Sequence, residues 1–152
     1  AANTAHFCLS ETRLGLIPAT IGPYVVRAMG EQAARRYALT AERFDAAEAL
    51  RLGFVHAVAP ADGLDARIEE ILAALMQTSG AAAREAKRLV REVAGRPIDE
   101  RLLADTAERI AAIRASDDGR EGVRAFLDKR KPRWVTDYEA EVAASEGDDE
   151  EM

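Results

Sequence analysis

The chain has 152 residues, of which 48% are apolar, 32% charged and 5% aromatic, a composition that fits one globular domain and excludes collagen-like, disulfide-scaffold and fully disordered proteins. No run approaches 18 consecutive apolar residues, so the sequence predicts no transmembrane helix. Its single cysteine, Cys8, lies in the apolar run Phe7-Cys8-Leu9 and cannot close an intrachain disulfide. This cysteine usage favours a reducing compartment and a cytoplasmic location.

The net charge of -6 is concentrated near the C-terminus. Residues 137–152 contain eight acids and no base, and the rest of the chain is close to neutral with a slight basic excess. Neither nucleic acid nor a membrane is therefore indicated as a partner. We expect residues 135–152 to be an acidic, disordered tail.

The chain opens with Ala1-Ala2-Asn3 and no initiator methionine. Its first apolar segment, residues 6–9, is too short to found a sheet on its own, so we expect strands that this sequence lacks. Residues 10–22 are rich in glycine and proline, which predicts loop and turns. Pro23 then suits the first turn of a helix that breaks at Gly30 and resumes over residues 31–39.

A capping box marks the next helix. Asp45 is followed three positions later by Glu48, and the helix that they open should end near Gly53. Residues 54–58 are apolar and end before a proline, which predicts a short strand, and Asp62 offers the next helix cap.

The remainder of the chain is predicted to be helical. Apolar residues recur with one-faced helical spacing over residues 64–75 and again over residues 82–93. Pro97 predicts the start of a further helix, and Asp118 with Glu121 forms a second capping box. So many amphipathic helices cannot all bury their apolar faces in a small body, so we expect faces shared with another subunit or with missing chain.

Most reaction classes lack the residues that they need. The sequence has no P-loop, no dinucleotide-binding glycine motif, no nucleophile elbow and no histidine or cysteine cluster that could hold a metal. We interpret His6 and His56 as ordinary packed or partly exposed residues, and Ser116 as a helix-start residue.

Glu11 is the first candidate for chemistry. It directly follows the apolar residues 7–9 and precedes the turn-forming stretch 14–18, where apolar surroundings suit a carboxyl that acts as a general acid or base. The alternative is a glutamate that pairs with Arg13 or faces solvent.

A second candidate lies in residues 125–132, where Phe126 precedes a mostly basic run that contains Lys129. A stacking ring beside cations suits a nucleotide-like anionic ligand. The alternative is a solvated helix end whose cations are favoured by the helix dipole.

Five separate segments together resemble the enoyl-CoA hydratase/isomerase (crotonase) family, in an order and spacing that fit over about residues 5–134. These segments are residues 7–18 (FCLSETRLGLIP), 27–30 (RAMG), 39–40 with 43–49 (LT and RFDAAEA), 52–55 (LGFV) and 121–132 (EGVRAFLDKRKP). Within the family, residues 19–26 (ATIGPYVV) look most like bacterial 3-methylglutaconyl-CoA hydratases of leucine degradation and acyclic-terpene catabolism.

The resemblance implies an α/β crotonase fold of which this chain is the C-terminal portion, mostly α-helical with a few short strands. It implies that Glu11 is the catalytic carboxyl acting on the α-carbon proton, and that Phe126 and Lys129 bind coenzyme A. It also implies a substrate pocket at Ala19, Ile21 and Gly22, where typical hydratases have a glycine-rich turn. Coenzyme A would enter as part of the acyl-CoA substrate, and neither a separate cofactor nor a metal is expected.

The resemblance further implies that residues 1–62 end the spiral core, that residues 63–134 form a helical trimerisation region, and that a homotrimer, a hexamer or a separate N-terminal half completes the molecule. A second catalytic glutamate and two oxyanion N–H groups would come from that N-terminal half, so we expect this chain alone to be inactive as a lyase. Two alternatives remain open: a non-catalytic oligomerisation module, and a Δ3,Δ2-enoyl-CoA isomerase, which needs one acid/base only.

Overall fold

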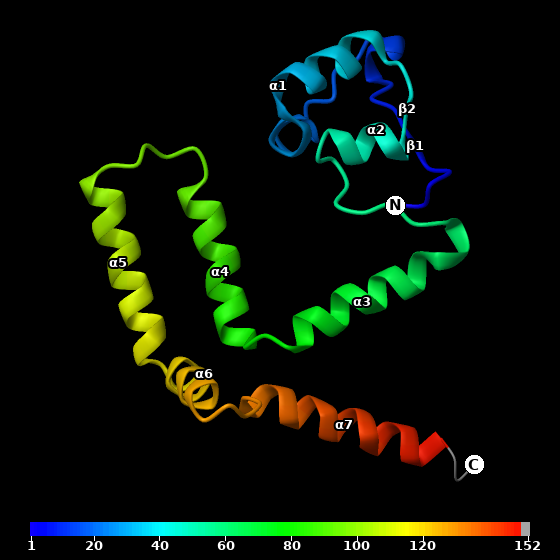
Figure 1. Ribbon diagram of the computed structural model, residues 1–152. Coiled ribbons are helices and arrows are strands. Elements are labelled where there is room, and N and C mark those ends of the chain that lie inside the picture. Colours follow the sequence, from blue (N-terminus) through cyan, green and yellow to red (C-terminus); the bar gives the residue numbers. More distant parts are fainter. Residues whose placement is uncertain (150–152) are drawn as a thin grey trace. The chain divides into compact units, whose positions relative to one another are not determined.

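The computed structural model describes residues 1–149, with side chains up to residue 144. The chain forms two compact units, Ala1–Glu70 and a second unit that begins at Ile71 (Figure 1). Within the described residues, seven α-helices and two short 3-10 helices accompany two strands of two residues each. The expected mostly helical chain with a few short strands is therefore confirmed.

Two short strands join the N-terminal segment to the middle of the first unit. β1 (His6–Phe7) pairs antiparallel with β2 (Phe44–Asp45). The Phe7 and Phe44 rings stack with centroids 5.4 Å apart, and Phe54 meets both rings edge-on at 5.3 and 5.9 Å. This aromatic cluster stabilises a ladder that is too short to persist by itself.

Helix α1 (Gly22–Thr40) carries most of the core of the first unit. Pro23 lies in its first turn, and the backbone leaves helical geometry at Gly30 (φ 80°, ψ 162°), where the sequence predicted a break. That positive φ suits a residue without a Cβ atom. The helix ends at Ala41, which is left-handed (φ 49°). The buried residues of the helix are Val25, Met29, Ala34 and Tyr37.

Helix α2 (Ala46–Arg51) begins where the sequence predicted a cap. The Asp45 side chain accepts a hydrogen bond from the Glu48 N–H at 2.8 Å. The Glu48 carboxylate accepts from the Tyr37 hydroxyl at 2.9 Å and from Arg51 Nε at 2.5 Å. Glu48 therefore ties α2 to α1 rather than returning to the cap residue.

The predicted strand over residues 54–58 is wrong. Gly53 adopts a φ of 72°, and the N–H groups of Phe54 and Val55 both donate to the Ala49 carbonyl, at 2.9 and 3.2 Å. These amides close the end of α2, so they are not free to pair in a sheet.

The sequence located most of the later helices but not all of their starts. Asp62 lies inside a short 3-10 helix, η2 (Ala61–Gly63), and is not itself a helix cap. Ser79, Asp99 and Ser116 each accept a hydrogen bond from a backbone N–H and begin the next three helices. Those elements, with the helix before them, are α3 (Leu64–Met76), α4 (Gly80–Val93), α5 (Glu100–Ala115) and α6 (Asp117–Leu127).

Ser116 is confirmed as a helix-start residue, whereas two other predicted starts are wrong. Helix α5 begins after Asp99 rather than at Pro97. The capping box of Asp118 and Glu121 does not form, because both carboxylates lie inside α6 and bind side chains from other segments. Long-range partners therefore override the local pattern.

The C-terminal segment, for which composition predicts a disordered tail, contains a helix in the described residues. Helix α7 (Arg133–Asp149) covers most of residues 135–152, and residues 150–152 lie outside the described part. Val135 is 3% exposed, and the Trp134 indole N–H donates to the Gln77 carbonyl at 3.2 Å. These contacts hold the first turn of α7 to its own unit.

Many apolar side chains of the later helices are only partly buried within the described residues. Within residues 1–149, no helix is long and apolar enough to cross a membrane. Along α3, the apolar side chains that the sequence placed on one face are about half exposed: Ile68 49%, Ile71 45%, Leu72 52% and Leu75 53%. The periodicity thus predicted the helix, but it did not predict how far the apolar face of that helix is buried.

Candidate functional site

Glu11 is the first residue of a short 3-10 helix, η1 (Glu11–Leu14), in the first unit. Its carboxylate oxygen Oε2 is buried and has no hydrogen-bond partner within the described residues. A buried carboxylate oxygen without a donor carries a desolvation cost that folded proteins usually avoid. Such an atom is therefore a strong candidate for chemistry rather than for stability.

Three side chains around Glu11 anchor this segment to the C-terminal end of α1. Thr12 Oγ1 donates to the Ala38 carbonyl at 3.0 Å. Arg13 Nη2 and Cys8 Sγ donate to the Ala41 carbonyl at 2.5 and 3.3 Å. The last carbonyls of a helix lack intrahelical partners and attract donors and cations, which explains these contacts.

The anchors also bear on one part of the alternative interpretation, in which Glu11 pairs with Arg13. Arg13 binds the carbonyl of Ala41, and the ion pairs of the described residues include none between Arg13 and Glu11. The alternative of a Glu11–Arg13 pair is therefore wrong. The role of Thr12 and Arg13 was not found from the sequence, because neither residue is close in sequence to its carbonyl partner.

A hollow of about 250 Å³ in the first unit lies beside this segment and is lined mainly by apolar residues. Gly22 lines it, whereas Ala19 and Ile21, predicted with Gly22 as substrate pocket, do not. Ile21 is 42% exposed. Besides Gly22, its apolar lining is Leu9, Pro18, Val25, Val26, Ala34 and Ala38.

Phe126 and Lys129 lie in the second unit, at the end of α6 and just after it. Phe126 is 82% exposed. Lys129 has a left-handed backbone (φ 52°). The structure brings Phe126 and Lys129 together at this helix end, and Glu11 belongs to the first unit.

Lys129 differs from the cations around it. Arg124 pairs with Asp128 at 3.0 Å, and Arg130 pairs with Glu121 at 2.7 Å. The other neighbouring ion pairs are Lys131 with Glu139 at 2.5 Å and Arg133 with Asp118 at 3.2 Å. Among the described residues, Lys129 has no ion-pair partner, so its ammonium is available to an external anion.

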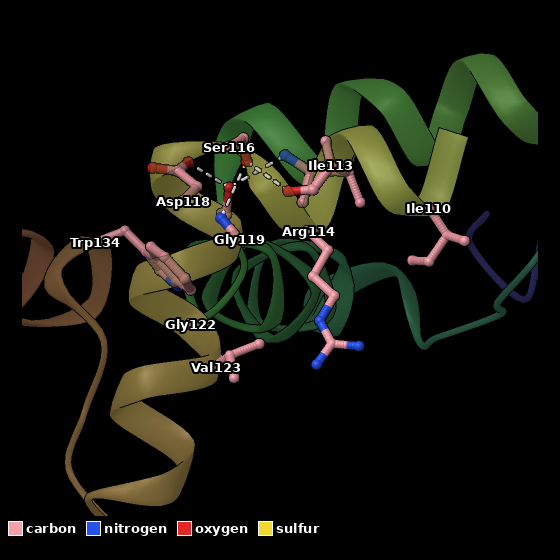
Figure 2. A pocket seen from close by; sticks show the side chains of 11 residues that line it. Ile110, Ile113, Arg114, Ser116, Asp118, Gly119, Gly122, Val123 and Trp134 are labelled. Atoms are coloured by element: carbon pink, nitrogen blue, oxygen red, sulfur yellow. Dashed lines mark hydrogen bonds between the residues drawn. The ribbon is translucent and has the colours of Figure 1, made fainter. Parts of the chain in front are cut away.

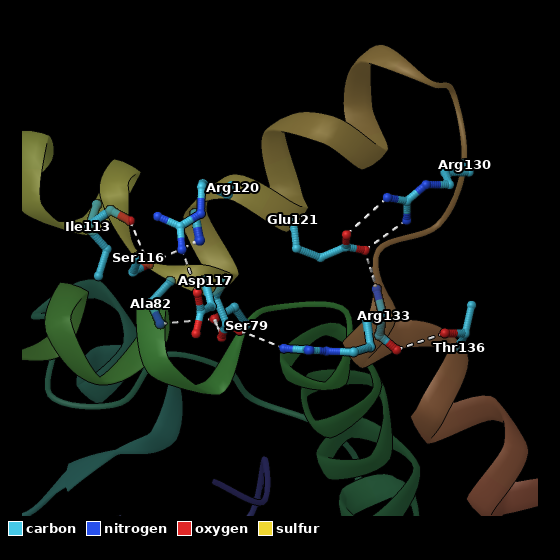
Figure 3. Close-up of polar contacts among 12 residues, drawn as sticks. Ser79, Ala82, Ile113, Ser116, Asp117, Arg120, Glu121, Arg130, Arg133 and Thr136 are labelled. Atoms are coloured by element: carbon cyan, nitrogen blue, oxygen red, sulfur yellow. Dashed lines mark hydrogen bonds and ion pairs between the residues drawn. The ribbon is translucent and has the colours of Figure 1, made fainter.

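Glu121 is the centre of the polar contacts after α6, as Figure 3 shows. It accepts hydrogen bonds from Arg130 Nη1 and Nη2, at 2.7 and 2.9 Å, and from the Arg133 N–H at 2.9 Å. The bonds from the Arg130 guanidinium, followed by the bond from the Arg133 backbone, lower the pKa of Glu121 to about 2. Glu121 is therefore ionised whenever the fold is intact near neutral pH.

A cavity of about 490 Å³ lies among α4, α5, α6 and the start of α7 (Figure 2). Ile110, Ile113, Val123 and Trp134 give it a largely apolar lining, and the Arg114 side chain also reaches it. The sequence did not predict this cavity, because its lining residues come from several separate helices.

The comparisons with known proteins agree with this architecture. Residues 1–137 match the family model described as enoyl-CoA hydratase/isomerase. A probable enoyl-CoA hydratase of Mycobacterium bovis is 37% identical over 136 residues, which are 89% of this chain and 52% of that protein. A crotonyl-CoA hydratase of Syntrophomonas wolfei is 30% identical over 137 residues, covering 90% of this chain and 52% of the relative.

A crystal structure of an enoyl-CoA hydratase from Shewanella pealeana is 50% identical and superposes with a TM-score of 0.83, covering 88% of this chain and 50% of that one. Fold and sequence together define a crotonase-type protein. This chain belongs to the enoyl-CoA hydratase/isomerase family, whose members take acyl-CoA substrates. It spans about half the length of the curated relatives that it matches.

Proposed function

We propose that this chain supplies the acid/base carboxyl of an acyl-CoA hydratase, which adds water across the Cα=Cβ bond of an enoyl-CoA thioester. The observation that carries the proposal is the buried Oε2 of Glu11, which has no donor within the described residues and sits on a segment anchored to α1. A carboxyl that is held in place and unsatisfied is ready to exchange a proton with a substrate.

The reaction needs little more than correctly placed proton donors and acceptors. The oxygen of water bonds to Cβ, the electron pair of the double bond moves towards the thioester oxygen, and Cα takes a proton. Glu11 delivers that proton in our proposal, while a second base accepts the proton that water loses. Donors that stabilise the developing enolate oxygen complete the site.

We further propose that residues 1–137 correspond to the C-terminal half of the family fold. The second carboxyl and the oxyanion donors would then come from an N-terminal half, and this chain alone would not turn over. Loss of one oxyanion donor costs on the order of 10²- to 10³-fold in rate, and loss of a positioned acid or base about 10²- to 10⁴-fold.

Hydration of short enoyl-CoA esters, including 3-methylglutaconyl-CoA, should be assayed with the chain alone and with an N-terminal half from a family member supplied. We expect activity in the combined sample only, and a loss of about 10²-fold or more in Glu11→Gln. Glu69→Gln, on exposed α3, is the matched control and should retain activity. Turnover by the unaided chain that disappears in Glu11→Gln would contradict the need for a second half.

An isomerase that moves the double bond from Cβ–Cγ to Cα–Cβ is the second candidate, because one carboxyl suffices for it. Glu11 provides the one buried, unpartnered carboxylate oxygen of the described side chains, which favours this alternative as well. Analysis of products from 2-enoyl and 3-enoyl esters separates the two reactions. Absence of both activities, with self-association retained, would favour the oligomerisation module.

We also propose that Phe126 and Lys129 contact the nucleotide part of coenzyme A. A free ammonium gives a charge-assisted bond to a phosphate that a neutral side chain cannot give. In the combined enzyme, Lys129→Ala should raise KM for the CoA ester and leave kcat largely intact. Equal binding of CoA and dephospho-CoA by the wild-type chain would show that Lys129 does not contact the 3'-phosphate.

A further inference from the structure

Helix α6 ends in a hydrogen-bond pattern that normally places glycine where this chain has lysine. The Lys129 N–H donates to the Phe126 carbonyl at 3.3 Å, and the Arg130 N–H donates to the Ala125 carbonyl at 3.0 Å. This pair of reversed bonds is the Schellman motif, whose left-handed residue is most often glycine. That residue is Lys129, with a φ of 52°.

A lysine at this position lowers stability relative to glycine, because its Cβ crowds the backbone in the left-handed region. Non-glycine residues in this region persist where their surroundings over-determine them, often at ligand-binding sites. In the part of the chain that the structure describes, Ala41 is the one other non-glycine residue with positive φ. Its carbonyl accepts from Arg13 and Cys8 at the Glu11 segment.

The residues after Lys129 are held by one carboxylate. Glu121 accepts hydrogen bonds from both terminal nitrogens of Arg130 and from the backbone N–H of Arg133 (Figure 3). It therefore binds the loop at two residues C-terminal to Lys129. On the other side, Asp128 is engaged by Arg124 at 3.0 Å. Among the side chains that the structure describes, these charged neighbours are paired with one another, and the Lys129 ammonium has no ion-pair partner.

We propose that Glu121 is the positioning residue of an anion site at Lys129, and that lysine occupies the left-handed position for the sake of its ammonium. The inference rests on the proposed contact between Lys129 and the phosphate of coenzyme A. It adds two statements to that contact. The hydrogen bonds between Glu121 and Arg130, here called the Glu121–Arg130 clamp, hold the Lys129 loop in place, and the left-handed backbone of Lys129 lowers the free energy of unfolding relative to glycine.

Lys129→Gly tests the stated cost. We expect this variant to melt at a higher temperature than wild type, and to bind CoA no better than dephospho-CoA. Lys129→Ala should lose the same discrimination without the gain in melting temperature. A melting temperature of Lys129→Gly at or below that of wild type would overturn the claim that lysine is unfavourable there.

Glu121→Gln tests the clamp. Calorimetric titration with CoA and with dephospho-CoA yields a ratio of affinities that reports on the 3'-phosphate contact alone, and a merely structural role would weaken both ligands equally. We expect a wild-type ratio of about tenfold or more, as for a hydrogen bond between charged groups, and a ratio near one in Glu121→Gln. Arg130→Gln should give the same result, and Glu139→Gln, which removes the partner of Lys131, should keep the wild-type ratio.

The outcomes separate the two proposals. A wild-type chain that binds both ligands equally, or neither, overturns the coenzyme A contact and the inference built on it. A wild-type preference for CoA that survives in Glu121→Gln and Arg130→Gln overturns the clamp alone. Amide hydrogen exchange at Lys129 and Arg130 gives an independent check, since it should accelerate in both clamp variants, and unchanged exchange would also overturn the clamp.

Discussion

Gly119 is a residue whose hydrogen atom cannot be replaced without moving backbone. A Cβ built there would fall on the carbonyl oxygen of Ile113 and lie 2.9 Å from the Cα of Arg114. Helix α6 therefore starts against the last turn of α5 with no room for a side chain, and the amide of Gly119 donates to Ser116 Oγ at 3.0 Å.

Gly119→Ala should lower the free energy of unfolding by about 1–3 kcal/mol, the usual cost of forcing a methyl group into a packed position. Urea denaturation of the variant and of the wild-type protein measures this difference in unfolding free energy. Gly80→Ala is the matched control, because a Cβ there would be 3.7 Å from the flexible end of Arg84 and alanine is the better helix former. Equal stabilities of Gly119→Ala and wild type would show that α6 can shift away from α5.

Arg13 gives a second prediction at the scale of one side chain. Arg13→Met removes the donor to the Ala41 carbonyl, and we expect a loss of about 0.5–1.5 kcal/mol in unfolding free energy. Hydrogen exchange should accelerate at the amides of η1 and at the amide of Leu16, which follows η1 and donates to the Glu11 carbonyl at 3.0 Å. Arg35→Met, which breaks only an exposed pair with Glu31, is the control and should leave these amides unchanged.

Carboxylates join neighbouring helices in both units. Glu92 of α4 accepts from Arg88 at 2.9 Å and from Arg109 of α5 at 2.6 Å, and the bond from Arg88, followed by the bond from Arg109, lowers the pKa of Glu92 to about 2. Glu48 joins α2 to α1, and its bonds from Arg51 and then Tyr37 lower its pKa to about 2 as well. Glu121 completes the set.

These three pKa values predict the acid limb of the stability curve. A carboxyl whose pKa is lower in the folded state stabilises the fold above its ordinary value of 4.5, and that contribution is lost as the pH falls towards about 2. Unfolding free energy should therefore decline over this range. In Glu92→Gln the decline should be shallower, and equal slopes for the two proteins would contradict the role of Glu92.

At the scale of whole helices, the sequence predicted where helices break and begin, but not which distant residues their side chains contact. The break of α1 at Gly30 and the caps at Asp45 and Ser116 could be predicted, because each depends on residues that are adjacent along the chain. The position of Asp118 could not, because its partners, Ser79 and Arg133, are 39 and 15 residues away.

For the whole molecule, the exposed apolar side chains of α3 predict self-association. We expect trimers or dimers of trimers, since apolar faces left uncovered by one chain are usually buried against copies of it. Light scattering at micromolar concentration measures the mass. Ile68→Lys with Leu72→Lys should reduce it, whereas Ala73→Lys, on another face of α3, should not. A well-folded wild-type monomer would contradict the prediction.

The sequence by itself determined the family, most of the helices and the identity of Glu11, Phe126 and Lys129 as candidates. The family resemblance depends on several separate segments whose order and spacing can be read along the sequence. Helix periodicity and capping depend on residues that are close together in the sequence. The candidate roles at the site were inferred from the resemblance and stay predictions, to be tested by the experiments above.

Only the tertiary structure decided how those residues are held. Thr12 and the Ala38 carbonyl, which anchor the Glu11 segment to α1, are 26 residues apart, and Glu121 and Arg130, which hold the Lys129 loop, are nine residues apart. The burial of Glu11 Oε2 likewise depends on what packs around it. The same holds for the acidic C-terminal segment: its composition predicts disorder, whereas the structure has helix α7 there, with Val135 buried in its first turn. Composition and spacing are properties of the sequence, whereas the burial and hydrogen-bond partners of a residue depend on which other segments pack against it in the fold.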